Sequence, residues 1–442
     1  MYESIKGKKI ILVGADAGIG SLTRYSIEIF KGNIITIVDN DSHKQGNYID
    51  DICIEKVQEA VSAYRDKAFY VITTKKKHKN LEKQLDDLGL EKGKNYEYLF
   101  CISEYFNPNR YSWYCKSIVK NGFYYPTRLR LELSSYCNLK CVYCRYHSAY
   151  YNTLPQGCNK NLSMELLEKI INEANEIGTI KEILNVQKGE MFCNPEWYAM
   201  LKYIRNNIEI DRFHFSTNGM MLKNDVVDRL MQLGFSELVI VVSLDGLTGE
   251  ENDRLRVGGN YDIIKKNIEY LLEHKTANTK VLIQNAQMLT NEFFDYYENN
   301  GFLEMDESNY LFEDFANDVE MNIYATLATG DEYIDSEICK QEDVSVKKAC
   351  IRQMVEGCNL PLNEIAIDSE GYIVVCGCEP WGELYRLGNI RDEKMIEIWN
   401  NDFMKGMRKK YSEGIEIPLC KKCISNALSK NGSEVFVKNC DC

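Results

Sequence analysis

Apolar residues recur along the chain with two periods, one typical of buried strands and one typical of amphipathic helices. The chain begins with an apolar run at 8–14, a glycine-rich turn, a helical stretch and a second apolar run at 33–41. Two strands joined by a helix in this way form a βαβ unit. Residues 1–118 are therefore predicted to form a small α/β domain.

From about residue 125 the chain alternates between strand-like and helix-like segments. Between 162 and 178, apolar residues fall on one helical face, namely Leu166, Leu167, Ile170, Ile171, Ala174 and Ile177. Strands are expected at 128–135, 180–187, 212–217, 237–245 and 280–287, with helices at 162–178, 196–207, 225–234 and 261–273. Repeated βα units predict a parallel sheet with helices outside it.

Length and composition limit the classes of protein that fit this chain. Its 442 residues suggest two or three domains, and no apolar run is long enough to span a bilayer. A net charge of -13 disfavours nucleic acid as a partner, because that affinity depends on clustered Lys and Arg. We expect a cytoplasmic protein with neither membrane nor nucleic acid as a partner. There, its 17 cysteines favour metal clusters over disulfides.

Three of the cysteines, Cys137, Cys141 and Cys144, stand close together in the run CNLKCVYC. Thiolates are the soft ligands that iron-sulfur clusters prefer, and three of them leave one iron of a four-iron cluster open to a small molecule. A structural zinc site is an alternative, with His147 as its fourth ligand. Buried thiols without any metal are the remaining interpretation.

The C-x3-C-x2-C spacing resembles the signature of the radical S-adenosylmethionine (SAM) family. In that family a [4Fe-4S] cluster binds SAM at its open iron, and SAM is cleaved to a 5'-deoxyadenosyl radical that takes hydrogen from a substrate. The resemblance implies that residues 119–325 form a partial (β/α)6 TIM barrel with its active site at the carboxyl ends of the strands. It also implies an electron donor such as flavodoxin or ferredoxin.

Further elements of the family follow the cysteines at successive predicted strand ends. Gly189-Glu190 resembles the element that holds the SAM amino group, although Lys188 replaces its first glycine. A carboxylate at this position suits an ammonium partner. Arg256 is implied to contact the SAM carboxylate, and Tyr143 to lie near the adenine. The full set of implied SAM contacts is Tyr143, Gly189, Glu190, Thr217, Asn218, Ser243, Asp245 and Arg256.

A second group of cysteines lies near the end of the chain. The surrounding sequence resembles the auxiliary-cluster domain of this family, called SPASM in its full form and twitch in its shortened form, and predicts such a domain at 326–442. The resemblance implies one auxiliary [4Fe-4S] cluster held by Cys358, Cys376, Cys420 and Cys423. Four thiolates suit zinc equally well, so a zinc site is the alternative. Cys440 and Cys442 are possible ligands of a second cluster.

The first domain resembles the Rossmann-like domains of polysaccharide and nucleotide-sugar biosynthesis proteins. Its turn, from Gly14 to Gly20, places Asp16 where the middle glycine of GxGxxG is expected. An aspartate would repel a pyrophosphate, which argues against a nicotinamide cofactor. Asp39 ends the second strand, where a ribose-binding acid is expected. A docking or structural module is the alternative interpretation of this domain.

These features predict a radical SAM enzyme that removes hydrogen from a carbohydrate or nucleotide-sugar substrate. The outcome is expected to be oxidation (dehydrogenation) or epimerisation, and no catalytic residue beyond the cofactor ligands is predicted. The alternative is radical modification, or maturation, of a ribosomally made peptide or protein. A metal-stabilised binding protein without catalytic activity is a third class.

Overall fold

The computed structural model describes residues 5–18, 21–75, 77–142, 144, 146–147, 160–185, 188–245, 248–286, 320–324, 347–350, 360–375, 386–415, 417 and 436–439. The chain divides into two compact units. Of these residues, the first unit contains those up to 117 and those from 407 to 417, and the second contains the rest.

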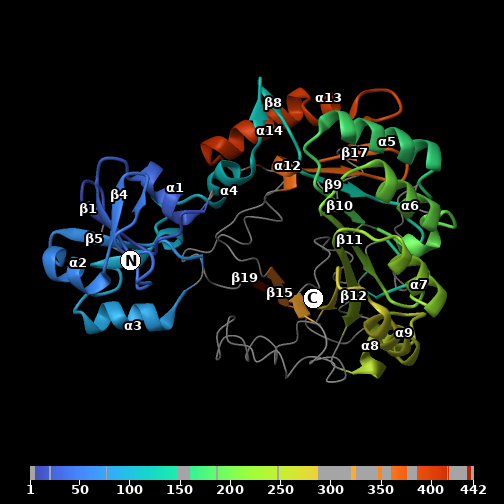
Figure 1. Ribbon diagram of the computed structural model, residues 1–442, viewed down its shortest axis with the longest axis horizontal. Helices are drawn as coiled ribbons and strands as arrows, with labels where there is room; N and C mark the ends of the chain where they lie inside the picture. Colours follow the sequence, from blue (N-terminus) through green and yellow to red (C-terminus); the bar gives the residue numbers. More distant parts are fainter. Residues whose placement is uncertain are drawn as a thin grey trace. The chain divides into compact units, whose positions relative to one another are not determined.

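The first unit is built on a six-stranded sheet in the order β3-β4-β2-β1-β5-β6 (Figure 1). Neighbouring strands are parallel except for β3 with β4. Its elements are β1 (Lys9–Val13), α1 (Leu22–Ile29), β2 (Ile34–Val38), β3 (Tyr48–Ile49), β4 (Ile52–Glu55), α2 (Val57–Tyr64), β5 (Ala68–Ile72), α3 (Lys79–Asp87), β6 (Tyr96–Tyr98), the 3-10 helix Leu99–Cys101 and α4 (Pro108–Lys116).

The central strand β1 is apolar because it is covered on both faces. Ile10, Ile11 and Leu12 are at most 1% exposed, as expected for a strand inside a parallel sheet. The α/β unit predicted from the sequence is therefore present, whereas its assignment as Rossmann-like stays a prediction. The unit also takes in residues beyond the predicted 1–118, since the Asn107 side-chain amide donates to the carbonyl of Gly414 at 3.1 Å.

The second unit contains a nine-stranded sheet in the order β14-β13-β12-β11-β10-β9-β16-β17-β18. From β14 to β16 all neighbours are parallel. The strands are β9 (Arg128–Leu131), β10 (Glu182–Asn185), β11 (Arg212–Thr217), β12 (Leu238–Asp245), β13 (Thr279–Ala286), β14 (Glu320–Tyr324), β16 (Glu364–Ile367), β17 (Tyr372–Val374) and β18 (Arg386–Asn389). Curvature of β9–β14 into a partial barrel stays a prediction.

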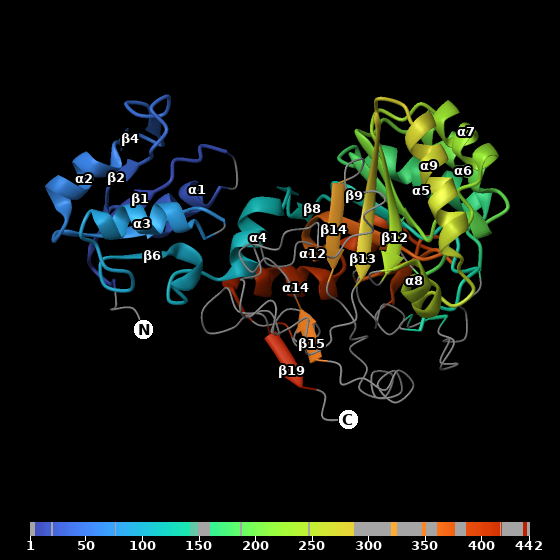
Figure 2. The same cartoon turned by 90° about the horizontal axis from the view of Figure 1, so that it is seen from below.

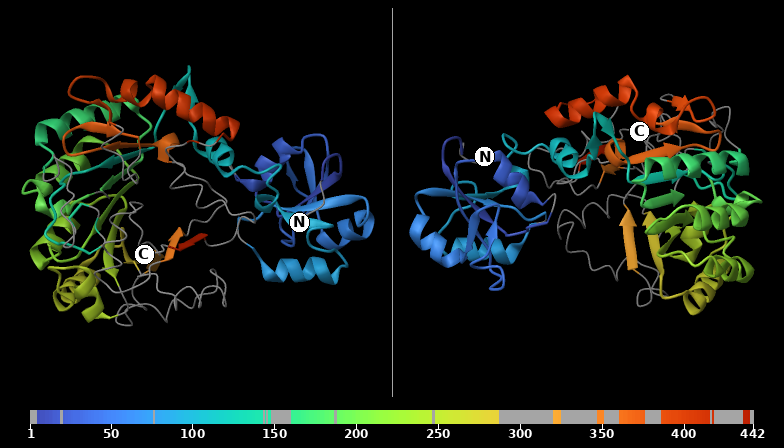
Figure 3. Two further views of the ribbon diagram at one scale, coloured as in Figure 1. Left: turned by 180° about the vertical axis from the view of Figure 1, so that it is seen from behind. Right: turned by 45° about the horizontal axis from the view of Figure 1, so that its top comes forward.

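Helices between these strands lie along one face of the sheet (Figures 1, 2 and 3). They are α5 (Met164–Ile177), α6 (Trp197–Asn207), α7 (Asn224–Gln232), α8 (Gly249–Leu255) and α9 (Tyr261–His274). Helix α5 begins at Ser163, whose side chain accepts from the N–H of Leu166, and ends at Gly178 with φ 69°. Its buried face consists of the six apolar residues that the sequence predicts.

Shorter elements complete the description. They are β7 (Val119–Lys120), β8 (Phe123–Tyr124), the 3-10 helix Met191–Cys193, β15 (Lys347–Cys350), α12 (Leu360–Asn363), α13 (Met395–Trp399), α14 (Asp402–Glu413) and β19 (Phe436–Asn439). In the described part of the chain, no helix is both long and apolar enough to cross a membrane.

Strand β16 joins the core sheet beside β9, although their sequence positions are far apart. Arg130 and Glu364 meet at this join, with Nε 2.6 Å from one carboxylate oxygen and Nη2 3.3 Å from the other. Arg128 lies 3.4 Å from the same carboxylate. Arg130 is 6% exposed and Glu364 is 1% exposed, so removing either charge leaves a buried partner with less compensation. Segments from the predicted core and auxiliary domains thus share one sheet, and a domain boundary near 325 stays a prediction.

We expect Glu364→Gln to destabilise the second unit, because it leaves the Arg130 guanidinium buried without its carboxylate. Breaking one partner of a buried pair costs about 3–5 kcal/mol, which corresponds to a drop in melting temperature of roughly 10 °C for a unit of this size. Glu176→Gln is the matched control, since its bridge to Lys394 is exposed on both sides and should contribute little to stability. Equal melting temperatures for both variants would contradict the role of this pair.

Candidate active site

The three clustered cysteines lie in the segment that follows β9. Cys141 is buried, and Cys137 and Cys144 are partly buried. Burial raises the pKa of the Cys137 thiol to about 12 and of the Cys141 thiol to about 11, and it also raises the pKa of Cys144. These thiols are therefore protonated near neutral pH, and a metal that binds them must displace their protons.

Backbone contacts hold this segment in place. The N–H groups of Lys140 and Val142 donate to the carbonyls of Val257 and Leu255, on either side of Arg256. The N–H of His147 donates to the sulfur of Cys144 at 3.3 Å. Hydrogen bonds of this kind to sulfur tune iron-sulfur clusters.

The zinc alternative depends on His147. Its ring Nε2 lies 2.9 Å from the carbonyl oxygen of Ser135, to which it donates, so this nitrogen is engaged with the backbone. Among the described residues, no group of three or more His, Cys, Asp or Glu side chains is arranged to hold a metal ion.

Gly189 packs directly against the chain that leads into the cysteines. A Cβ atom at this position would lie 2.4 Å from the carbonyl oxygen of Ser134 and 2.5 Å from that of Tyr136. The next residue, Glu190, donates its N–H to the Tyr136 carbonyl at 2.7 Å. Only glycine allows this approach, because these neighbours are backbone atoms that cannot move aside cheaply.

Glu190 is 2% exposed and lies between the ends of two strands. Its carboxylate accepts from the Thr217 hydroxyl at 3.0 Å and from the Asn218 N–H at 2.9 Å. Burial raises the pKa of Glu190 to about 7, despite these hydrogen bonds. The Asn218 amide donates in turn to the side chain of Asn138, which follows Cys137. Four predicted site residues, Gly189, Glu190, Thr217 and Asn218, are therefore brought together with the cysteine segment.

Asp245 and Arg256 form a buried ion pair with Nε 2.6 Å from Oδ2. Asp245 is 0% exposed and Arg256 is 8% exposed. Burial alone would lower the pKa of Arg256, but the Asp245 carboxylate, together with the nearby Cys141 and Cys137, outweighs it and the pKa is raised. Arg256 also lies near Cys141 and Cys137, and its positive charge would stabilise their thiolate forms once the protons have left. Its predicted contact with the SAM carboxylate stays a prediction, since its observed partner is Asp245.

The remaining predicted contacts are less fully described. Ser243 lies within β12 and is partly buried. Tyr143 lies outside the described residues. So do all the proposed auxiliary-cluster ligands and the terminal pair, namely Cys358, Cys376, Cys420, Cys423, Cys440 and Cys442.

Sequence reasoning did not single out two groups of polar residues in this unit. Asn138 contacts Asn218, and Asn252 accepts from the N–H of Asp245 at 3.1 Å. Glu132 and Asp368 follow β9 and β16, and burial raises the pKa of both. The sequence signal that could have found Glu132 and Asp368 is an acid at the end of a strand. Asp245 has the same position at the end of β12.

Two protein-family models match the chain. Residues 131–284 match the Radical SAM superfamily, and residues 358–424 match SPASM, an iron-sulfur cluster-binding domain. The first match contains the three cysteines and every implied SAM contact, and the second contains all four proposed auxiliary ligands.

Curated relatives match parts of the chain. AdoMet-dependent heme synthase of Methanosarcina barkeri is 27% identical over 62% of this chain and 82% of its own length. Probable GTP 3',8-cyclase of Methanococcus maripaludis is 31% identical over 34% of this chain and 48% of its own. Mycofactocin maturase of Mycobacterium tuberculosis is 27% identical over 37% of this chain and 39% of its own. The chain thus spans under half of the latter two relatives.

These matches identify the cofactors. The Radical SAM domain binds a [4Fe-4S] cluster and SAM, and the SPASM domain binds auxiliary iron-sulfur clusters. They also favour an enzyme over a non-catalytic binding protein. The donor set fits the first cluster and SAM by its chemistry, because three thiols share one short segment and the ionisable carboxyl of Glu190 is buried close to it, although the described side chains are not gathered around one metal position.

We expect Gly189→Ala to reduce iron at the first cluster, because a Cβ would push the cysteine segment out of position. Changes next to metal ligands typically cost 10–100-fold in metal affinity or activity, and we expect about that loss in SAM cleavage. Iron content and 5'-deoxyadenosine formation measure both effects.

Gly406→Ala in α14 is the control for that substitution, since a Cβ there meets nothing within 4 Å. It should keep full iron and raise stability by up to ~1 kcal/mol. Full iron loading and turnover in Gly189→Ala would show that the close approach is not needed.

Proposed function

We propose that this radical SAM enzyme generates a 5'-deoxyadenosyl radical and uses it to remove hydrogen from a ribosomally made peptide or protein. The proposed radical generation rests on one observation: the Cys137–Cys144 segment lies against Gly189 and the buried Glu190. When bound, the cluster supplies the electron that splits SAM, and SAM supplies the radical.

The residues of this chain hold and orient those groups. Cys137, Cys141 and Cys144 are proposed to ligate the cluster, which leaves one iron for SAM. Glu190 is proposed to receive the SAM ammonium, because a buried carboxylate with fixed partners gains most from a cation beside it. Thr217 and Asn218 hold that carboxylate in place through the hydrogen bonds described above.

Other strand-end groups complete the proposed cofactor site. Asn218 directly follows β11, and Ser243 and Asp245 lie in the last three residues of β12. Their amide, hydroxyl and carboxylate groups are proposed to serve the ribose. Arg256, held by Asp245, places a permanent positive charge near the thiols. A flavodoxin or ferredoxin is the proposed electron donor.

The proposed substrate class is chosen because of the relatives. The carbohydrate expectation rests only on the resemblance of the first domain. The names of the three relatives given above refer instead to heme, GTP and mycofactocin. The similarity to a maturase supports the alternative, modification of a peptide or protein. Loss of a hydrogen atom to the 5'-deoxyadenosyl radical, then of an electron that an auxiliary iron-sulfur cluster would accept and of a proton to solvent, would give an oxidised product. Return of a hydrogen atom from a donor to the opposite face of the substrate radical would instead give an epimer.

A label-transfer experiment tests both parts of this proposal. Extract from the source cells grown in deuterated medium is divided by size, and each fraction is added to anaerobic, reduced enzyme with SAM. We expect deuterium to appear in 5'-deoxyadenosine with the peptide fraction, and protease treatment of that fraction to abolish the transfer. Transfer from the protease-resistant small-molecule fraction alone would contradict the peptide substrate and restore a small-molecule one.

Two variants serve as controls for the radical chemistry itself. The triple alanine variant at Cys137, Cys141 and Cys144 should form no 5'-deoxyadenosine, because it lacks the cluster ligands. Cys53→Ala, in β4 of the first unit, should retain wild-type activity. If the triple variant formed 5'-deoxyadenosine at the wild-type rate, the proposed radical chemistry would be wrong.

SAM affinity is expected to depend on pH through Glu190. With a pKa of about 7, this carboxyl is neutral below pH 7 and charged above it, and only the charged form attracts the SAM ammonium. Affinity should therefore rise up to pH 7 and fall about tenfold for each pH unit below it, because one proton must leave on binding. Titration of SAM into reconstituted protein between roughly pH 5.5 and 8 measures this dependence.

Glu190→Gln is the control because it keeps the shape and removes the titrating group. It should bind SAM more weakly and without this slope. The same pH profile in wild type and Glu190→Gln would assign the titration to another group.

A further inference from the structure

Two buried acids of the second unit, Glu132 and Asp368, have no part in the proposed cofactor site. Glu132 directly follows β9, and Asp368 directly follows β16, the parallel neighbour of β9. The Glu132 N–H continues this pairing, because it donates to the carbonyl of Ile367 at 3.0 Å. Glu132 is 2% exposed and Asp368 is 3% exposed. Two carboxyls are thus enclosed at neighbouring strand ends, close to the start of the cysteine segment.

Asp368 is occupied by partners within the protein. One of its oxygens accepts from the N–H groups of Glu370 at 3.0 Å and Tyr372 at 2.9 Å. The other oxygen lies 3.1 Å from Arg386, which also lies 2.9 Å from the carboxylate of Glu370. These contacts fix the turn between β16 and β17, so the role of Asp368 is structural.

Glu132 differs, because only one of its two oxygens has a partner. Oε1 accepts from the Ser369 hydroxyl at 2.8 Å and from the Ser369 N–H at 3.3 Å. Oε2 is shielded from solvent and has no hydrogen-bond partner among the residues that the structure describes. Leaving a buried polar atom without a partner is costly, so such an atom in a native protein calls for an explanation. Oε2 is therefore the open position of this cluster.

The surroundings of Glu132 favour uptake of a proton. Burial, the largest effect, and the Asp368 carboxylate raise the pKa of Glu132, whereas Lys188 and the Ser369 donors lower it. The net shift is upward, as is usual for carboxyls that act as acids or bases. An enclosed oxygen also has room for a proton, whereas an organic cation would need a cavity.

The position of Glu132 in the sheet suits a role in the reaction. The strand registers place Arg130 of β9 and Val239 of β12 in one row across the sheet. Because alternate residues of a strand share a face, Glu132 lies on the same face as Ser243, which belongs to the proposed cofactor site. Glu132 is within the Radical SAM match and its partner Ser369 is within the SPASM match. The acid therefore lies where the two matched segments meet.

We propose that Glu132 accepts, directly or through one bound water, the proton that the substrate radical releases when it is oxidised. This inference rests on the proposed function and selects oxidation over epimerisation. A carboxylate takes up a proton readily, but a carboxylic acid is a poor donor of the hydrogen atom that an epimerase must return.

The oxidation removes two hydrogens from a substrate group HC–YH, where Y is carbon, nitrogen or oxygen. The C–H bond breaks and its hydrogen atom goes to the 5'-deoxyadenosyl radical. The substrate radical then gives one electron to an oxidised auxiliary iron-sulfur cluster and the Y–H proton to the Glu132 carboxylate. A C=Y double bond forms, and Glu132 becomes a neutral acid that later passes its proton to solvent.

The label-transfer reaction tests this role, with the peptide fraction of the deuterated extract as the probe. Wild-type enzyme should form one oxidised peptide, detected by mass spectrometry as the loss of two hydrogens, for each deuterated 5'-deoxyadenosine. Glu132→Gln keeps the shape but cannot take up the proton, so it should still transfer deuterium. Its yield of oxidised peptide per 5'-deoxyadenosine should fall about tenfold or more, since a positioned proton acceptor usually contributes ~10²-fold or more to the rate.

Two variants and one spectrum serve as controls. Glu132→Asp keeps a carboxylate and should restore part of the lost yield, and Glu168→Gln, an exposed substitution in α5, should leave the yield unchanged. Infrared spectra of the protein without substrate give a readout independent of activity. A neutral-carboxyl band that persists to higher pH than that of an ordinary glutamate should be missing from Glu132→Gln.

The outcomes separate this inference from the function on which it rests. If wild-type enzyme transfers no deuterium, the proposed function is wrong and the role of Glu132 is wrong with it. The role of Glu132 alone is wrong if deuterium transfer yields no oxidised peptide, or if Glu132→Gln retains the wild-type yield. It is also wrong if both Glu132 variants lose deuterium transfer, which indicates a structural role, or if no infrared band depends on Glu132.

Discussion

The close packing of Gly189 against the backbone at Ser134 and Tyr136 is the constraint on which the described active site depends. It brings the end of β10 against the chain that leads into the cysteines, with no side chain between them. Glu190 directly follows Gly189, and its N–H donates to the Tyr136 carbonyl, so the position of Glu190 is fixed as well. One glycine therefore sets the separation between the cysteine segment and the Glu190 carboxyl.

From that contact a chain of polar groups extends along the carboxyl ends of the strands. Thr217 and Asn218 donate hydrogen bonds to the Glu190 carboxylate, and the side-chain amide of Asn218 donates to Asn138 in the cysteine segment. On the next strand, Asp245 holds Arg256 close to the same thiols. The buried Arg130–Glu364 pair plays a different part, because it fixes β16 beside β9 and so attaches the segment before Cys376 to the core sheet.

The sequence was most informative where local pattern and family order agreed. The apolar face of α5 is buried as its spacing predicts, since helical period alone determines which residues face the sheet. Glu190, Thr217 and Asp245 cluster because parallel strands place their carboxyl ends at one edge. The pairing of β16 with β9 was not predictable, because it joins residues such as Arg130 and Glu364, which are 234 positions apart and share no local signal. The Asp245–Arg256 pair was missed because each residue was assigned to the cofactor rather than to the other.

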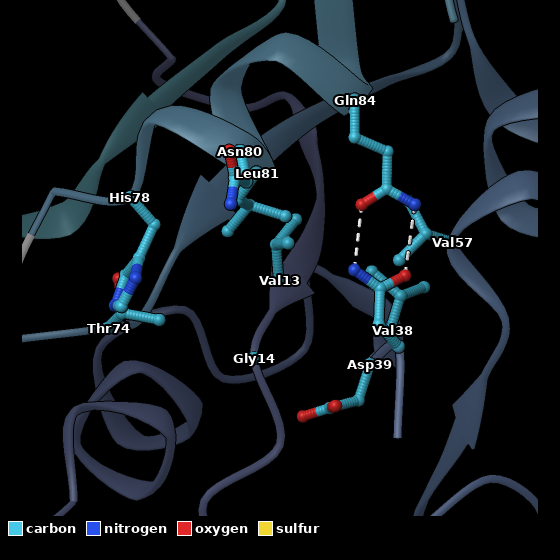
Figure 4. Close-up of a pocket in the computed structure, with 11 residues that line it drawn as sticks. Val13, Gly14, Val38, Asp39, Val57, Thr74, His78, Asn80, Leu81 and Gln84 are labelled. Atoms are coloured by element: carbon cyan, nitrogen blue, oxygen red, sulfur yellow. Dashed lines mark hydrogen bonds between the residues drawn. The ribbon is translucent and has the colours of Figure 1, made fainter. Parts of the chain in front are cut away.

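The first unit contains a cavity at the carboxyl ends of β1, β2 and β5 (Figure 4), and its resemblance to dinucleotide domains does not by itself give a function. The central claim concerns the cluster in the second unit, and Mössbauer spectroscopy of protein reconstituted with ⁵⁷Fe tests it most directly. The account predicts that SAM changes the signal of a single iron, the one without a thiolate, and that this signal is missing from the variant without Cys137, Cys141 and Cys144. A spectrum that SAM leaves unchanged, or a responsive iron that survives loss of these cysteines, would contradict it.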